Sequence, residues 1–263
     1  MIILSFDVGI KHLAYCLIQI NSCQCNYTIS SWDCINLCNI ICQADESCDK
    51  PAIYCKNKMY YCKTHAKNQT TYLVPKINLK KLKLSELNTL VKQHHLDEKE
   101  ESIPNKKSAL LEFLQEQFLE KVNSNANQMD LIKLGINMKN SFDELFQPNK
   151  IDYVLIENQI SPIATRMKTF QGMITQYFIM KDCYNIIYVS SINKLKHFIT
   201  KKLSYKERKT ASIDVTIQQL KENDKLYLLW MDFFNKHKKK DDLADCYLQG
   251  LWFIKDRNLL KYN

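Results

Sequence analysis

Glycine is scarce in this chain, and long apolar runs are missing. Only 4 of the 263 residues are glycine, so no glycine-rich loop is available to cradle phosphates, which sets aside P-loop and Rossmann nucleotide sites. No apolar stretch reaches the roughly 18 to 20 residues of a membrane span. The N-terminus also lacks the basic segment and cleavage site of a secretory signal. We therefore expect a soluble intracellular protein that uses neither a nucleotide cofactor nor a membrane.

Basic residues outnumber acidic ones, 37 against 28, which gives a formal net charge of +9. This surplus favours a polyanionic partner, with nucleic acid first and an anionic membrane surface second. Hydrophobic residues make up 46% of the chain, enough for a sizeable core. The 11 cysteines are an odd number and many fall in predicted strands or helices. We therefore expect a reducing compartment and no disulfide framework.

Apolar and β-branched runs predict five strands, interrupted by a long segment of different composition. The first three strands are expected within residues 2–6, 13–20 and 26–37. From about residue 42 to residue 148 the chain is rich in cysteine and lysine, and we interpret this segment as an insertion. The remaining elements are strands at 152–160 and 185–191 and helices at 164–182, 204–221 and 241–256. This order predicts an α/β protein with a mixed sheet and an antiparallel edge.

Two predicted strands end in a carboxylate directly after an apolar run. Asp7 follows "IILSF" and Glu157 follows "YVLI". Burying a carboxylate costs several kcal/mol unless it is paired or bound to a metal, so each of the two needs a partner. Asp242 and Asp245 lie three residues apart at the start of the last predicted helix. They share one helix face, where their charges repel unless a cation lies between them.

These four carboxylates, from two strand ends and one helix face, predict a site for divalent metal ions. Mg²⁺ and Mn²⁺ prefer oxygen ligands, and two ions roughly 3.5 to 4 Å apart can hold the attacking and leaving oxygens of a phosphodiester. For Asp242 and Asp245 alone, the alternative is an acidic first turn that complements the helix dipole. Together with the strand ends, the set favours two-metal phosphodiester cleavage.

Three segments resemble the RuvC-like Holliday junction resolvases of poxviruses and other large DNA viruses, which belong to the RNase H-like superfamily. The segments are "FDVGIKHLAYC", "VLIENQ" followed by "RMKTFQGMITQYF", and "KKKDDLADCYLQG", in the order of the family. The resemblance covers residues 1 to about 35 and 150 to 263. It implies a five-stranded sheet of order 3-2-1-4-5 with flanking helices, a homodimer, and Mg²⁺-dependent symmetric nicking of four-way junctions. It also implies four catalytic acids: Asp7, Glu157, Asp242 and Asp245.

The resemblance further implies a catalytic lysine between the fifth strand and the last helix. A lysine there can stabilise the pentacovalent phosphate or polarise the attacking water. We favour Lys209 and then Lys196. The residues we expect to contact DNA are Arg166, Lys168, Gln171, Lys206 and Arg208. A family of this kind also implies a location in a viral replication factory in the host cytoplasm, or in the virion.

The insertion departs from the poxvirus pattern and carries metal-ligand spacing of its own. The candidate ligands of one structural zinc ion form a Cys₃His set that closes with C-x-x-H: Cys42, Cys48, Cys62 and His65. Cys55 is a spare or a substitute for Cys42. The segment "AIYCKNKMYYC" predicts a two-stranded ribbon that turns at Asn57. The alternative is a group of reduced, buried thiols without a metal.

Residues 73–148 predict two amphipathic helices separated by a charged loop. They resemble a SAP module, a small helix-loop-helix DNA-binding unit that also accompanies the yeast mitochondrial resolvase. A plain helical hairpin packed on the core is the alternative. We therefore expect a nuclease core at 1–38 and 149–263, a zinc ribbon at 39–72 and a SAP-like insert at 73–148.

The sequence thus predicts a structure-selective endonuclease that resolves four-way DNA junctions. Two alternatives stay open: an RNase H-like nuclease that acts on flaps or other branched DNA, and a non-catalytic DNA-binding protein that uses the zinc and SAP-like parts. The intact set of acids argues against the second. The expected homodimer has a candidate interface on the 164–182 helix, where the apolar residues are too many for one core. Burial within one chain is the alternative for these residues: Phe170, Ile174, Tyr177 and Phe178.

Overall fold

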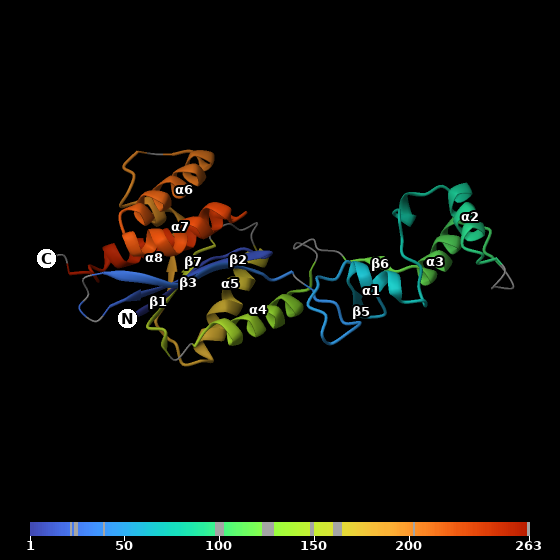
Figure 1. Ribbon diagram of the computed structural model, residues 1–263, viewed down its shortest axis with the longest axis horizontal. Coiled ribbons are helices and arrows are strands. Elements are labelled where there is room, and N and C mark those ends of the chain that lie inside the picture. The colour runs from blue at the N-terminus through green and yellow to red at the C-terminus, as the bar shows by residue number, and fades with distance from the viewer. Residues whose placement is uncertain are drawn as a thin grey trace. The chain divides into compact units, whose positions relative to one another are not determined.

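The chain forms two compact units, residues 1–38 with 125–263, and residues 39–124. The computed structural model describes residues 1–21, 23, 26–38, 40–97, 103–122, 129–147, 150–159, 165–201 and 203–261. The larger unit is a sheet covered by helices on both faces, and the smaller unit contains short strands and helices (Figure 1). No helix in these described ranges has both the length and the apolar character to cross a bilayer.

Five strands form the sheet of the larger unit, in the order β3-β2-β1-β7-β8. They are β1 (Ile2–Asp7), β2 (His12–Ile20), β3 (Tyr27–Asn36), β7 (Tyr153–Glu157) and β8 (Ile186–Val189). β1 pairs antiparallel with β2 and parallel with β7, β2 pairs antiparallel with β3, and β7 pairs parallel with β8. Counting only the strands of this sheet, the order is 3-2-1-4-5. The expected mixed five-stranded fold is therefore confirmed.

Helices lie on both faces of this sheet. On one face lie α4 (Leu131–Leu145) and α5 (Thr165–Ile179), and on the other α6 (Tyr205–Lys221), α7 (Asp224–Lys236) and α8 (Lys240–Asp256) (Figure 1). Successive side chains of β1 point to opposite faces of the sheet, so they pack against both helix layers. Phe6 stacks on Phe142 of α4 with ring centroids 5.3 Å apart, whereas Ile3 joins the core cluster that includes Leu243 of α8. The sequence analysis did not anticipate α7 as a separate helix.

Helix α8 lies close against the sheet because a glycine faces it. A Cβ added to Gly250 would lie 2.5 Å from Cδ1 of Ile18 on β2. The adjacent Gln249 donates from Nε2 to the carbonyl of Phe6 at 3.1 Å, and Trp32 of β3 donates from its indole nitrogen to the carbonyl of Leu243 at 3.0 Å. These contacts hold the first turns of α8 beside the end of β1.

The smaller unit has two parts. In the first, β4 (Tyr54–Lys56) pairs with β5 (Met59–Tyr61) and β6 (Glu120–Lys121), and α1 (Lys63–Asn68) follows. Asn57 and Lys58 have φ angles of 47° and 67°, as a two-residue hairpin turn requires, so the ribbon predicted to turn at Asn57 is confirmed. The second part contains η1 (Leu79–Lys81), α2 (Leu84–Gln93) and α3 (Lys107–Gln117).

The boundary near residue 148 differs from the expectation. Helix α4 belongs to the larger unit, whereas the sequence analysis placed it in a helical insert at 73–148. The reason is aromatic packing across the chain, since Phe142 and Phe146 of α4 both contact Phe6 of β1. A helix can be recognised from its own periodicity, but the surface it covers depends on residues far away in sequence. The insert therefore ends near residue 124.

The four apolar residues of α5 considered for a dimer interface are buried inside the larger unit. Phe170, Ile174 and Phe178 are 0% exposed and Tyr177 is 8% exposed. Phe178 contacts both Phe6 and Phe142, so this face of α5 packs on the sheet and on α4. The alternative of burial within one chain is the one that the structure shows, and these residues leave no apolar surplus for a dimer interface.

Candidate active site

The four predicted acids line one cleft of about 270 Å³ in the larger unit. Asp7 is the last residue of β1 and Glu157 the last residue of β7. Because these two strands are parallel neighbours, both carboxylates lie at the same edge of the sheet. Asp242 and Asp245 come from the first turns of α8. The juxtaposition expected from strand ends and helix spacing is what the structure shows.

A buried lysine lies among these acids. Nζ of Lys194 lies 2.7 Å from Oδ1 of Asp7, 3.2 Å from Oε1 of Glu157 and 3.0 Å from Oδ2 of Asp245. Its side chain is only 4% exposed. Lys194 belongs to η3 (Ser191–Leu195), the short helix that follows β8. One ammonium group therefore joins acids from three separate elements.

The surroundings shift the pKa values of the three aspartates and of the lysine. Burial raises the pKa of Asp7 to about 6, although the Lys194 charge opposes the shift. Burial also raises the pKa values of Asp242 and Asp245 above their ordinary range. For Lys194, burial disfavours the charged form, but the charges of Asp7, Asp245 and Glu157 outweigh it and raise the pKa. The cleft therefore favours a bound cation at neutral pH.

The lysines favoured from the sequence lie outside this cluster. Lys209 lines the same cleft, but its Nζ pairs with Oδ2 of Asp241 at 2.7 Å and lies 5.5 Å from the ring centroid of Tyr205. Lys196 is exposed and caps the C-terminal end of η3. Sequence reasoning missed Lys194 because the segment is rich in lysine and η3 is too short to show a periodic pattern.

The residues of the cleft fit a pair of hard divalent cations. The donors are carboxylate oxygens from two strand ends and one helix, which is the ligand type that Mg²⁺ and Mn²⁺ prefer. Asp242 is the acid most removed from Lys194, and its carboxylate lies 3.4 Å from Nζ of Lys239. Ser212, buried in α6, also hydrogen bonds to Asp245. The cleft thus combines carboxylate oxygens of the type that hard cations prefer with a fixed internal cation.

The side chains expected to contact DNA differ in their exposure and in their hydrogen bonds. Arg208 is exposed and lines the acidic cleft, and Lys168 is exposed on α5. Gln171 is 7% exposed and accepts a hydrogen bond from the backbone of Gln159 at 3.0 Å, so it holds the segment after Glu157. Arg166 donates from its guanidinium to the carbonyl of Met129. Arg208 and Lys168 are therefore the better placed to meet a phosphate backbone.

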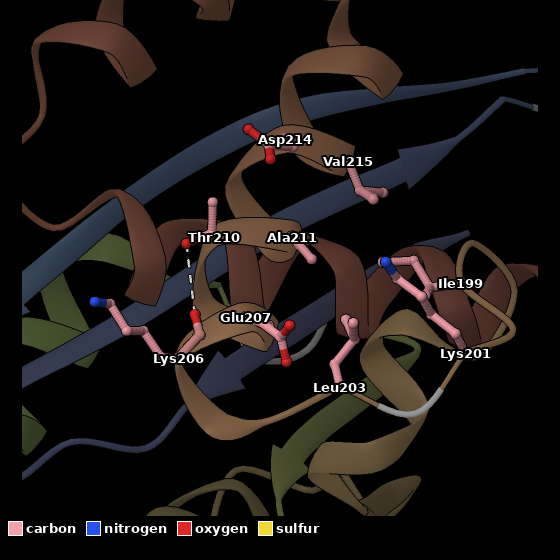
Figure 2. A pocket seen from close by; sticks show the side chains of 9 residues that line it. All are labelled: Ile199, Lys201, Leu203, Lys206, Glu207, Thr210, Ala211, Asp214 and Val215. Atoms are coloured by element: carbon pink, nitrogen blue, oxygen red, sulfur yellow. Dashed lines mark hydrogen bonds between the residues drawn. The ribbon is translucent and has the colours of Figure 1, made fainter.

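Lys206 lines a different hollow, a groove of about 460 Å³ beside α6. Figure 2 shows this groove, with Lys206 and Thr210 along the helix and Ile199 and Leu203 on the segment that precedes it. Ala211 and Val215 add further apolar surface. None of the four acids of the cleft lines this groove. Lys206 therefore lies apart from the four acids.

The predicted zinc ligands come together in the smaller unit. The ligand atoms of Cys42, Cys48, Cys62 and His65 all lie within 4.8 Å of one another. Cys55 is not part of this group; it lies in β4, opposite Tyr60 of β5. The choice between Cys42 and Cys55 that the spacing left open is resolved geometrically in favour of Cys42.

Two solved structures of resolvases resemble the chain at low sequence identity. The fowlpox virus resolvase in complex with Holliday junction DNA gives a TM-score of 0.47 at 16% identity, covering 98% of this chain and 99% of that one. The yeast mitochondrial Holliday junction resolvase Ydc2 gives 0.45 at 13% identity, covering 98% and 80%. An uncharacterized protein of Acanthamoeba polyphaga mimivirus is 27% identical over 325 residues, which span 97% of this chain and 74% of that protein.

A family comparison covers more than half of the chain. The family described as Poxvirus A22 protein matches residues 103–257. This range contains Glu157, Lys194, Asp242 and Asp245, and of the residues that line the cleft it leaves out only Asp7. Because this match spans more than half of the chain, the chain belongs to the Poxvirus A22 protein family.

Proposed function

We propose that this protein resolves four-way DNA junctions by metal-dependent nicking of the phosphodiester backbone. The observation that carries the proposal is the cleft in which Asp7, Glu157 and Asp245 surround Lys194, with Asp242 beside them. Membership of the Poxvirus A22 protein family supports it, as does the net charge of +9, which suits a polyanionic substrate.

Asp7, Glu157, Asp242 and Asp245 would hold two Mg²⁺ or Mn²⁺ ions. Bound there, the ions would supply Lewis-acid activation of the attacking water and of the scissile phosphate. The carboxylates hold their positions because β1, β7 and α8 are fixed by the sheet and by the Gln249 contact with Phe6. Such fixed ligands reduce the reorganisation needed when the phosphate reaches its transition state.

We assign to Lys194 the stabilisation of the negative charge that develops on the phosphate during cleavage. Its ammonium is buried and held by three carboxylates, so it is fixed in position before DNA arrives. A fixed cation next to a developing negative charge stabilises the transition state more strongly in a site that excludes water than in bulk water. Arg208 and Lys209 line the same cleft and would contact the phosphates that flank the scissile one.

The smaller unit would make DNA contacts of its own. Its helical part, η1 with α2 and α3, has a core of its own that includes Leu87, Leu110 and Leu114, as a SAP-like module requires. Exposed lysines lie at the start of these helices: Lys80, Lys81, Lys83, Lys106 and Lys107. They would attract the arms of a junction through their phosphates. For the Cys/His cluster of this unit we propose one zinc ion.

A homodimer is the assembly we propose, because a junction with two-fold symmetry needs two nicks in opposing strands. The α5 face cannot supply the interface, since Phe170, Ile174 and Phe178 are buried in the chain. The viral relatives support a viral protein, and we propose that it acts in a replication factory of the host cytoplasm or in the virion.

A panel of matched DNA substrates tests the proposal. Wild-type protein with Mg²⁺ or Mn²⁺ should nick a four-way junction at symmetric positions at least about tenfold faster than a flap or a linear duplex built from the same sequences. Faster cleavage of flaps would instead establish the flap-nuclease alternative. Tight junction binding without any nicking in either metal would establish a non-catalytic DNA-binding protein.

A further inference from the structure

Residues 40–72 have almost no hydrophobic core. The buried residues of this stretch are Cys42, Cys62 and Ala66, at 4%, 2% and 0% exposure. Two of the three belong to the Cys/His cluster. A segment of this size cannot offset its loss of conformational entropy by apolar burial alone, and small domains of this kind rely on a metal or on disulfides.

The neighbouring helical part has its own core. Seven buried apolar residues form one cluster there: Leu79, Leu87, Val91, Leu96, Leu110, Leu114 and Phe118. The contrast lies within one compact unit, in which one part is rich in apolar contacts and the other contains the cluster of potential ligands. The two parts should therefore differ in what holds them folded.

The four ligand atoms are gathered almost as a tetrahedral ion requires. Sγ of Cys42 lies 3.2 Å from Nδ1 of His65, and all four atoms lie within 4.8 Å of one another. In a tetrahedral site with Zn–S bonds of about 2.3 Å and a Zn–N bond of about 2.0 Å, neighbouring ligand atoms lie about 3.5 to 3.8 Å apart. Shifts of about 1 Å or less would complete the site.

The backbone around the cluster is arranged by the same residues. Cys62 precedes α1, and its Sγ accepts a hydrogen bond from the backbone of His65 at 3.4 Å. Cys42 donates from its backbone to the carbonyl of Lys50 at 2.9 Å, which closes the loop that carries Cys48. The ligands thus come from a closed loop and from the turn after the ribbon, and an ion would tie the two together.

The donor set selects the kind of ion. Three sulfurs and one imidazole suit zinc and exclude Mg²⁺ and Ca²⁺, which take oxygen ligands. Four protein ligands also leave no open position for water, so the site is structural and not catalytic. Such an ion is distinct from those of the acidic cleft, whose donors are all oxygens.

We infer that a zinc ion bound by Cys42, Cys48, Cys62 and His65 takes the place of a hydrophobic core in residues 40–72, and that α2 and α3 keep their fold without it. This inference rests on the zinc assignment proposed above, but it does not depend on the nuclease activity. Removal of the metal should unfold the ribbon and α1 locally, because binding free energy at such a site is folding free energy.

Cys55 provides a matched control within the same ribbon. It is a cysteine in β4, half-buried, and lies outside the group of four. Full-length Cys55→Ser should hold about one zinc per chain, as the wild type does, when purified with a phosphine reductant and without chelators. Cys42→Ser should hold less than about a fifth of that amount, because one of the four bonds is lost. Elemental analysis measures both.

Hydrogen exchange of the full chain then tests the role of the ion. Wild-type protein stripped by a zinc chelator should exchange the amides of residues 40–68 at least about tenfold faster, with recovery when zinc is added back. The amides of α2, α3 and β1 should change less than about twofold. Stripping avoids dependence on a variant that fails to fold.

Four results would overturn the inference. They are wild-type protein without zinc, zinc retained by Cys42→Ser, unchanged exchange of residues 40–68 after stripping, and loss of protection in α2 and α3 together with the ribbon. A wild-type protein that holds zinc but does not nick junctions would refute the nuclease proposal alone. The failures of the two proposals are therefore distinguishable.

Discussion

Nζ of Lys194 lies 2.7 Å from Oδ1 of Asp7, although the two residues are 187 positions apart in the chain. The contact joins the first strand of the sheet to the short helix after the last strand. Because the Lys194 side chain is 4% exposed, its charge is balanced by protein carboxylates and not by water. The charges of the acids and of the lysine therefore depend on one another. Removal of any one of these side chains leaves a buried charge without compensation.

Replacement of Lys194 should cost activity more than replacement of either lysine favoured from the sequence. We expect Lys194→Met to lower the single-turnover nicking rate by roughly a hundredfold or more, since it removes a fixed charge next to the phosphate. Lys196→Met is the matched control in the same segment and should change the rate by only a few-fold. Equal losses in the two variants would contradict the assignment.

Metal binding should weaken in acid. Burial raises the pKa of Asp7 to about 6, so in the metal-free protein this carboxyl is largely protonated at pH 5 and ionised at pH 7.5. Protons and metal ions compete for the same oxygen. The rise in Tm that Mn²⁺ causes should therefore be smaller at pH 5 than at pH 7.5, and Asp7→Asn should reduce this difference. An equal rise at both pH values in the wild type would count against the raised pKa.

Gly250 and Gly172 should respond oppositely to the same substitution. A Cβ at Gly250 meets Cδ1 of Ile18 at 2.5 Å, whereas a Cβ at Gly172 of α5 meets nothing within 4 Å. Gly250→Ala should destabilise the fold by about 1 to 3 kcal/mol through overpacking, and Gly172→Ala should stabilise it by about 0.5 to 1 kcal/mol. Urea unfolding measures both. Ile18→Val removes Cδ1 and should rescue Gly250→Ala; no rescue would refute the proposed clash.

Asp143 should stabilise the packing of α4 on α5 at neutral pH. Hydrogen bonds from Lys139 and Tyr177 hold the pKa of Asp143 at about 2, below its ordinary value of 3.8. Because the folded pKa is the lower one, this stabilisation is fully present above about pH 4 and is lost as the pH falls toward 2. The difference in unfolding midpoint between wild type and Asp143→Asn should therefore be larger at pH 7 than at pH 3. If the difference in unfolding midpoint did not depend on pH, the lowered pKa of Asp143 would be contradicted.

Local sequence patterns were sufficient to find the acids and to expect a mixed sheet, whereas the strand order was expected from the family resemblance. Asp7 and Glu157 each follow an apolar run, and the spacing of Asp242 and Asp245 puts them on one helix face, so their meeting follows from strand direction and helix period. The same holds for the Cys and His spacing that closes with His65. In each case the residues are recognisable from a local pattern, whereas the meeting of Asp7 and Glu157 depends on the pairing of β1 with β7.

Long-range packing accounts for what the sequence did not reveal. Lys194 is one lysine among several between β8 and α8, and only the fold brings it to Asp7. The place of α4 depends on Phe142 meeting Phe6, which no local period encodes. The burial of the apolar face of α5 likewise depends on α4, because Phe178 packs on Phe142 as well as on the sheet. The sequence of α5 alone does not show this second contact surface.

The most direct test of the acidic cleft compares wild type with Asp7→Asn on a four-way junction in Mg²⁺. Asp232→Asn serves as the control, because Asp232 is 77% exposed on α7 and pairs only with Lys236 among the described residues. We expect paired symmetric nicks from wild type and control, and a loss of roughly a hundredfold or more in Asp7→Asn with junction binding within a few-fold. Nicking by Asp7→Asn at the wild-type rate would contradict the central claim that these acids hold the catalytic metal ions.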